Sequence, residues 1–205
     1  MNLILRTSDS VVIYAGDQFK LTETGVTGDN YLDPSLTPAN ASQVVATGAF
    51  PATYISGCYT YVNGVWTVVT GKEAMVAAAL APLKAAFIKK VDTDVDAIYD
   101  AAVGNRGPEY DQASLDANAF KAASYGGTIP SSVSSWATAK GWSAQVAADD
   151  IIAAAARLAA ARDAIRAQRL LRKEQAKATT DSTALETVSA QWVGFVAAVR
   201  SQLGV

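Results

Sequence analysis

The pattern of apolar and polar residues changes near residue 70. Before it, short runs of β-branched and aromatic residues are separated by Ser, Asp and Gly, which is typical of short strands joined by turns. After it, apolar residues recur every three to four positions, a helical pattern. The sequence therefore predicts an α+β protein. A small antiparallel β domain is expected over residues 1–70 and an all-α region, with one long helix, over residues 71–205.

Four strands are predicted outside the best-defined turn. They cover Asn2–Arg6, Val11–Tyr14, Gln18–Thr22 and Gln43–Thr47. Residues 27–41 contain Gly and two prolines and are predicted to form a loop.

The strongest local signal is the segment CYTYVNGVWTVV, in which Asn63-Gly64 separates two alternating runs. Asn-Gly supplies the positive φ angles of a type I′ turn, so a hairpin is predicted with strands over residues 58–62 and 65–69. The hairpin carries three aromatic residues, Tyr59, Tyr61 and Trp66. We expect them to pack across the strands, with a binding platform as the alternative.

Two capping boxes mark expected helix starts, each a threonine followed three residues later by a glutamate. One lies at Thr70–Glu73 and should open a helix over residues 72–103, kinked or restarted at Pro82. The other lies at Thr183–Glu186 and should open the last helix, over about residues 183–203.

Between them, two shorter helices are expected over residues 110–123 and 130–141, with Pro130 at the first position of the second. A long helix over about residues 143–180 follows, because this segment has no Gly or Pro and is dense in strong helix formers. Ser143 is the expected N-cap. Such a helix is a rod roughly 55 Å long.

The long helix changes character along its length. In its first half, Ile151, Leu158 and Ile165 form an apolar stripe with alanines between them, so this half is expected to be buried. Farther along the same stripe the residues are basic: Arg162, Arg166, Arg169 and Lys173. We expect this second half to be exposed or to face a partner, and these four residues are candidate partner contacts. A solvated helix whose arginine stems cover apolar neighbours is the alternative.

Charge is segregated along the helical region. Residues 157–177 hold seven basic residues against two acidic ones, a net charge of +5, whereas residues 92–116 hold seven acidic residues against Arg106 alone, a net charge of −6. The simplest hypothesis is that the two segments pair, either within one chain or between neighbouring copies.

The last predicted helix has a strongly apolar face, which consists of Val188, Trp192, Phe195, Val196, Val199 and Leu203. Such a stripe usually belongs to a core. Because it carries two large aromatic residues, a seam between subunits is the alternative. Trp192 and Phe195 are therefore further candidate partner contacts.

The composition argues against catalysis. The 205 residues include no histidine and a single cysteine, Cys58. The commonest general base and metal ligand is therefore missing, and neither an intrachain disulfide nor a cysteine zinc site can form. The run Asp92-x-Asp94-x-Asp96 resembles the start of a calcium loop, but Ala97 and Val103 stand where an EF-hand has Gly and Glu. We expect no enzyme, no catalytic or metal site and no cofactor.

Composition also bears on partners. Half of the residues are hydrophobic and the net charge is −2, as in a soluble folded protein. The basic segment has no interleaved aromatic residues, so nucleic acid is not an expected partner. The N-terminus lacks the features of a signal peptide, and no apolar run of membrane-spanning length occurs, so no membrane partner is expected and synthesis should take place in a cytoplasm.

Five signals follow one another between residues 106 and 174. They are Ala-x-x-Phe at 117–120, Tyr-Gly-Gly-x-Ile-Pro at 125–130, Ser-x-Trp-Ala at 134–137, Ala-Ala-Asp-Asp-Ile at 147–151 and Ile-Arg-x-x-Arg at 165–169. This order, over roughly a third of the chain, resembles a helical module in tail-associated proteins of tailed bacteriophages, namely tail-fibre, baseplate and tail-fibre-assembly proteins.

The resemblance implies one of two roles. The first is a structural component of the virion tail, made in the host cytoplasm, at the baseplate, tail tip or fibre attachment. It would contact other tail or fibre proteins, as a homo-oligomer or in multiple copies, with the β domain as a docking module. The second is a tail-fibre assembly chaperone that is absent from the mature particle. A helical adaptor protein unrelated to phages is a third possibility.

Overall fold

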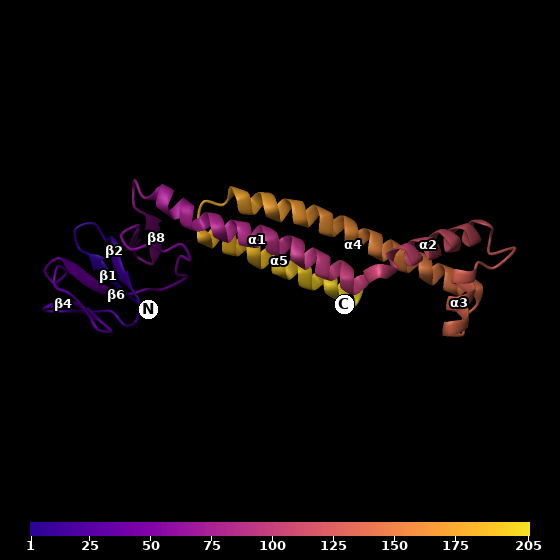
Figure 1. Ribbon diagram of the computed structural model, residues 1–205, viewed down its shortest axis with the longest axis horizontal. Helices are drawn as coiled ribbons and strands as arrows, with labels where there is room; N and C mark the ends of the chain where they lie inside the picture. The colour runs from indigo at the N-terminus through magenta and orange to yellow at the C-terminus, as the bar shows by residue number, and fades with distance from the viewer. The chain divides into compact units, whose positions relative to one another are not determined.

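The computed structural model describes residues 1–205 and confirms the α+β class, with short strands followed by helices (Figure 1). The strands are β1 (Asn2–Arg6), β2 (Val12–Ala15), β3 (Lys20–Thr22), β4 (Gly25–Gly28), β5 (Tyr31–Asp33), β6 (Ala41–Val45), β7 (Tyr59–Val62) and β8 (Val65–Val68). The helices are α1 (Glu73–Ala102), α2 (Gly107–Ala122), α3 (Ser131–Lys140), α4 (Ala144–Ala178) and α5 (Ser182–Leu203), with a 3₁₀ turn, η1 (Gly104–Arg106), before α2.

The chain divides into two compact units. Unit 1 comprises Met1–Phe87 and Ala176–Val188, and unit 2 comprises Ile88–Gln175 and Ser189–Val205. The strands end close to the predicted boundary at residue 70, but parts of three helices belong to the same compact unit as the strands. Within unit 1, for example, the Ala52 amide donates to Ser182 Oγ of α5 at 3.1 Å.

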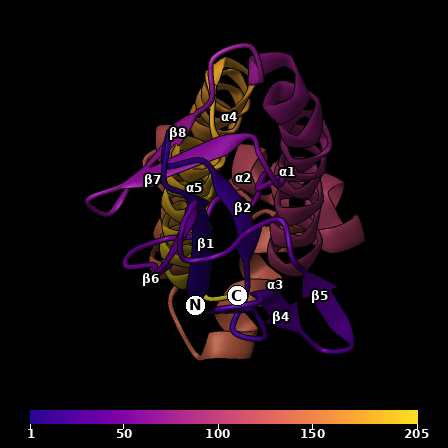
Figure 2. The same ribbon diagram turned by 90° about the vertical axis from the view of Figure 1, so that its left-hand side faces the viewer.

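The strands of unit 1 form three small antiparallel sheets, ordered β2-β1-β6, β3-β4-β5 and β7-β8 (Figure 2). The central strand β1 is buried on both faces. Leu3 and Leu5 pack in one cluster with Tyr61, whereas Ile4 packs in another with Val26. This alternation follows from the two-residue repeat of a strand, which sends successive side chains to opposite faces.

The hairpin β7–β8 is confirmed. Asn63 and Gly64 have φ angles of 50° and 84°, as a type I′ turn requires. The expected aromatic packing is also present, because the ring centroids of Tyr61 and Trp66 are 4.8 Å apart and those of Tyr59 and Trp66 are 6.2 Å apart. These residues therefore belong to the core of unit 1.

The prediction of a loop over residues 27–41 was wrong in its first half. β4 ends inside it and β5 lies wholly within it, and the two strands pair from Val26↔Asp33 to Gly28↔Tyr31. The turn between them contains Asn30 with a φ of 60°, a conformation that Asn tolerates better than most residues. Two such short strands leave too few residues for an alternating pattern to be recognised.

The predicted long helix is confirmed as α4, and its expected N-cap is present because Ser143 Oγ accepts a hydrogen bond from the Val146 amide at 3.3 Å. The two predicted capping boxes are wrong. Asp181, not Thr183, caps α5, since its Oδ1 accepts from the Ala184 amide at 2.8 Å. α1 begins at Glu73, so Lys72 occupies its N-cap position and Thr70 lies two residues earlier, too far to act as the cap.

Two predictions that concern prolines are wrong: a helix restart at Pro82 and Pro130 at the first helical position. α1 continues through Pro82 without a break, so no new helix starts there. Pro130 occupies the N-cap position of α3 rather than its first helical position. Its fixed φ, here −59°, suits either position.

Burial along α4 differs from the prediction. No residue between Ile151 and Ala160 is fully buried, whereas Ala161 and Ile165 are. Alanine side chains are too short to exclude solvent by themselves, so burial follows the elements that neighbour the helix. The expected division into a buried first half and an exposed second half was therefore wrong.

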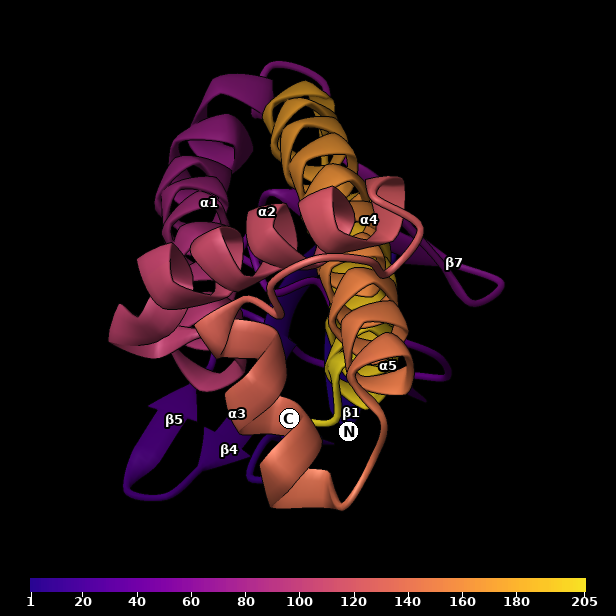
Figure 3. The same ribbon diagram turned by 90° about the vertical axis from the view of Figure 1, so that its right-hand side faces the viewer.

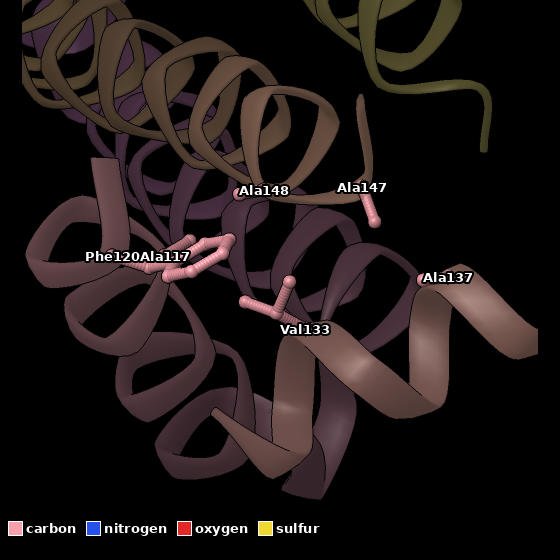
Figure 4. Packing of buried hydrophobic residues seen from close by; sticks show 6 residues of the cluster. All are labelled: Ala117, Phe120, Val133, Ala137, Ala147 and Ala148. Carbon is pink, nitrogen blue, oxygen red and sulfur yellow. The ribbon is translucent and has the colours of Figure 1, made fainter. Parts of the chain in front are cut away.

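The start of α4 packs with α2 and α3 around a small core of its own in unit 2 (Figure 3). The core consists of Ala117 and Phe120 from α2, Val133 and Ala137 from α3, and Ala147 and Ala148 from α4 (Figure 4). Small alanines on two of the helices let their backbones approach Phe120 closely. We call this part of unit 2 the three-helix tip.

Candidate interaction surfaces

A single carboxylate of α1 binds two of the four basic side chains on the stripe of α4. Arg169 Nε donates to Asp92 Oδ1 at 2.8 Å, and Lys173 Nζ donates to both carboxylate oxygens at 2.7 and 2.6 Å. The Lys173 hydrogen bond is the largest of the causes that hold the pKa of Asp92 below its usual range. The predicted pairing of the acidic and basic segments therefore takes place within one chain for these residues.

The other two basic side chains of the stripe are open. Arg162 approaches Asp111 with its Nη1 3.8 Å from Oδ1, near the upper limit for an ion pair, and the Asp111 side chain is 67% exposed. Arg166 lies one turn farther along, and its side chain forms no hydrogen bond or ion pair. The stripe thus contains two residues that hold the fold together and two whose guanidinium groups remain accessible.

A hollow of about 370 Å³ lies beside these two arginines, lined by Tyr99, Val103, Arg162 and Arg166. A second hollow, of about 390 Å³, adjoins it at Val103 and lies around the end of α1 and the turn η1. The stripe predicted from sequence is therefore next to a concave surface only at its Arg162 end.

Trp192, predicted as a candidate partner contact, has no exposed surface. Its indole N–H donates to Asp94 Oδ2 at 2.8 Å, and the same carboxylate accepts from Lys90 at 2.6 Å. Arg172 nearby binds the side chains of Gln175 and Gln191. A buried indole whose only polar atom is already bound cannot form a seam between subunits, so the seam interpretation of Trp192 was wrong.

Phe195, the second aromatic candidate, is half-buried. Its ring centroid lies 5.6 Å from that of Trp192. Phe195 therefore covers the buried indole and leaves part of its own ring at the surface.

Sequence reasoning missed an exposed aromatic surface on the three-helix tip. The ammonium group of Lys140 lies 4.7 Å from the ring centroid of Trp136 and 5.7 Å from that of Trp142. The two indole-bearing residues are 37% and 42% exposed. Trp136 Nε1 also donates to Asp150 Oδ2 at 2.9 Å. Val146, one turn before Asp150 on α4, is half-exposed. We call Trp136, Lys140, Trp142 and Val146 the tryptophan surface.

This surface had one signal in the sequence: two tryptophans within seven residues, with a lysine between them, at the end of a short helix and in the turn that follows it. Cation–π contacts hold the lysine against the rings, so the sequence spacing Trp136-x₃-Lys140-x-Trp142 could have indicated it.

The adjacent carboxylates Asp149 and Asp150 serve different neighbours. Asp149 accepts from Lys121 Nζ and from the Tyr125 hydroxyl, each at 2.8 Å, whereas Asp150 binds Trp136. The Lys121 hydrogen bond is the largest cause that lowers the pKa of Asp149, and the bond to Asp149 raises the pKa of Tyr125. These contacts connect α2 and α3 to α4, so both carboxylates have a structural role in unit 2.

No group of three or more His, Cys, Asp or Glu side chains is arranged to hold a metal ion. None of the helices combines the length and the apolar character that crossing a membrane requires. No protein-family model, curated protein or solved structure matches the chain.

Proposed function

We propose that this chain is a structural component of a bacteriophage tail, at the baseplate, tail tip or fibre attachment, and that it acts through protein–protein contacts. The observation that carries the proposal is that the residues which resemble phage tail proteins, 106–174, include those that build the three-helix tip and its tryptophan surface. The resemblance supports a place in a phage tail, and the exposed tryptophan surface supports binding to another protein there.

Exposed tryptophans support a contact role for physical reasons. Tryptophan is among the residues that contribute most to binding energy at protein interfaces. In the tip, Lys140 holds both rings in place, so docking a partner would immobilise few additional torsions. A partner would remove apolar indole surface from water, which is favourable in proportion to the area covered.

Unit 1 supports a second point of contact. The hairpin β7–β8 is a two-stranded sheet, so the outer edge of β8 is not paired with another strand. Val62 and Val65, on either side of its turn, are both exposed. An open strand edge with exposed apolar residues is a surface on which an extended segment of another chain can add. The proposal therefore gives unit 1 a docking role.

The proposal assigns no catalytic step to the chain. Asp92 and Asp94 of α1 and Asp149 of α4 each bind side chains of the same protein, and the chain contains no histidine that could act with a carboxylate.

Mass spectrometry of purified particles tests the proposal. Peptides of this chain are expected in a fixed ratio to an established tail protein of the same phage. If the chain is abundant in the lysate but missing from particles, the structural role is wrong, and the assembly chaperone implied by the same resemblance replaces it.

A variant connects the surface to this role. Trp142→Ala should lower incorporation into particles, because it removes an exposed indole that has no side-chain hydrogen bond. Leu115→Ala is the matched control, because Leu115 is 66% exposed in the same unit but lies on α2. Equal incorporation of the two variants would contradict a role for the tryptophan surface.

A further inference from the structure

The basic stripe of α4 is divided by the positions of two carboxylates. Asp92 lies within 2.8 Å of Arg169 and Lys173 and binds both. At the other end, Asp111 reaches Arg162 only at 3.8 Å. Because Arg162 and Arg166 are one helical turn apart on the same face, their like charges repel. The fold compensates this repulsion with a single loose ion pair, which leaves a positive site open.

The hollow beside these arginines combines charge with an apolar wall. Arg162 and Arg166 supply guanidinium groups, and Tyr99 and Val103 from the end of α1 line the same space. A guanidinium presents a planar fork of donors that matches a carboxylate in two parallel hydrogen bonds. The apolar wall suits the methylene groups that carry a glutamate or aspartate carboxylate.

Asp111 shows that a carboxylate can approach this site. It is mostly exposed and its distance from Arg162 is at the limit of an ion pair, so a carboxylate with better geometry would displace it at little cost. Arg166 would meet no internal competitor.

The geometry favours a carboxylate over a phosphate. α1 ends at Ala102, and the Val103 amide is already bound to the Tyr99 carbonyl at 2.9 Å. The end of α1 is therefore the negative end of a helix dipole, which opposes any anion and opposes a dianion more than a monoanion. The two guanidinium groups must supply the attraction, and a single negative charge is the easier one for them to hold. Typical phosphate sites instead use the amides of a helix N-terminus.

We propose that this hollow, formed by Tyr99, Val103, Arg162 and Arg166, binds a carboxylate side chain in an acidic segment of a partner protein. The carboxylate chemistry follows from the geometry of unit 2. That its source is a protein rests on the proposed function, which it deepens by naming the chemistry of one contact. The prediction from sequence that Arg162 and Arg166 contact a partner is retained here, whereas Arg169 and Lys173 have an internal role.

The test is an NMR titration of the full chain, labelled with ¹⁵N and ¹³C, that follows the arginine Nε–H signals. The probe is the synthetic peptide acetyl-Gly-Glu-Glu-Glu-Gly-amide, with acetyl-Gly-Gln-Gln-Gln-Gly-amide as the uncharged control. The acidic peptide should give saturable shifts at Arg162 and Arg166, while Arg169, bound to Asp92, should change little. The control peptide should give none.

Three variants sharpen the titration. Arg166→Gln should weaken binding at least tenfold, while Arg157→Gln, the same charge change on an exposed residue away from the stripe, should leave it unchanged. Asp111→Asn removes the internal competitor and should strengthen binding severalfold. Gln has nearly the helix propensity of Arg, and far-UV circular dichroism of each variant verifies that α4 remains folded.

Three results would overturn the inference: no saturable shift with the acidic peptide, equal weakening by Arg157→Gln and Arg166→Gln, or equal shifts with inorganic phosphate at the same concentration. The particle measurement is independent of all three. Absence of the chain from particles with intact peptide binding would remove the structural tail role alone, and presence without peptide binding would remove the carboxylate site alone.

Discussion

Replacing Trp192 by Phe tests the packing of unit 2 directly. The side chain is 0% exposed and is the largest fully buried one in the protein. Its indole N–H donates to Asp94 Oδ2 at 2.8 Å. Phe keeps one aromatic ring but lacks the N–H donor and the second ring. The variant therefore tests whether this core needs the hydrogen bond to Asp94 or only an apolar side chain.

The expected cost has two parts. A hydrogen bond to a charged acceptor contributes about 1.5–3 kcal/mol, and the low end applies because Asp94 keeps its bond to Lys90. The missing ring leaves a partly filled cavity that costs roughly 1–2 kcal/mol. We therefore expect Trp192→Phe to lower the free energy of unfolding by about 3 kcal/mol.

Urea unfolding followed by circular dichroism at 222 nm measures this change without relying on tryptophan fluorescence. Val193→Ala is the matched control, because Val193 is the next residue of α5 and is 53% exposed. It should change stability by less than about 0.5 kcal/mol. A double-mutant cycle with Asp94→Asn should give a coupling energy of about 1–2 kcal/mol. A loss below about 1 kcal/mol for Trp192→Phe, or no coupling with Asp94, would refute the argument for a buried, hydrogen-bonded indole.

Two further predictions concern charge and backbone. Asp92→Asn should lower stability at pH 7 by up to about 1 kcal/mol, because Arg169 and Lys173 lose their shared carboxylate at a partly exposed site. The folded-state pKa of Asp92 lies below its unfolded value of about 3.9. The difference between wild type and variant should therefore be complete above the unfolded pKa and should vanish as the pH falls through the folded one. Stability curves from pH 2 to 7 check this, and a difference that persists at the acid end would contradict it. Gly64→Ala should cost roughly 1–2 kcal/mol, because Gly64 has a φ of 84° in the hairpin turn. Gly107→Ala, at the start of α2 with open space around its Cα, should be neutral, and equal thermal shifts of the two variants would contradict the turn assignment.

Local signals predicted much of the fold. The ends of α4, at Ala144 and Ala178, lie within two residues of the predicted limits, because helix propensity and the absence of Gly and Pro act over short range. The hairpin was also predicted correctly, because the turn preference of Asn63-Gly64 depends on those two residues alone. The caps were harder, since Asp181 and Thr183 are both suitable residues two positions apart and only the geometry of the first turn selects one.

Features that depend on distant residues could not be read from the pattern. Trp192 lies on a face that fits a core and also allows a seam, and the carboxylate that binds its indole N–H, Asp94, lies 98 positions earlier in the chain. Likewise, Arg162 and Arg169 occupy one stripe. Only the positions of Asp92 and Asp111 in space make one a structural residue and leave the other accessible.

The tryptophan surface was missed because its one signal, the spacing of Trp136, Lys140 and Trp142, is not part of a periodic pattern. Trp136 lies on α3, whereas Trp142 lies in the turn between α3 and α4. Because the chain turns there, the ammonium group of Lys140 contacts both rings. The spacing marks the three residues, but their exposure and their mutual contacts are known only from the structure.

The most direct test of the central claim is the number of copies of this chain per purified particle. Targeted mass spectrometry with isotope-labelled standard peptides, applied to successive fractions of a density gradient, measures that number against an established tail protein. A structural tail component should keep a constant, stoichiometric ratio across all fractions that contain intact particles. A ratio that falls to background in those fractions, while the chain stays abundant in the lysate, would contradict the account.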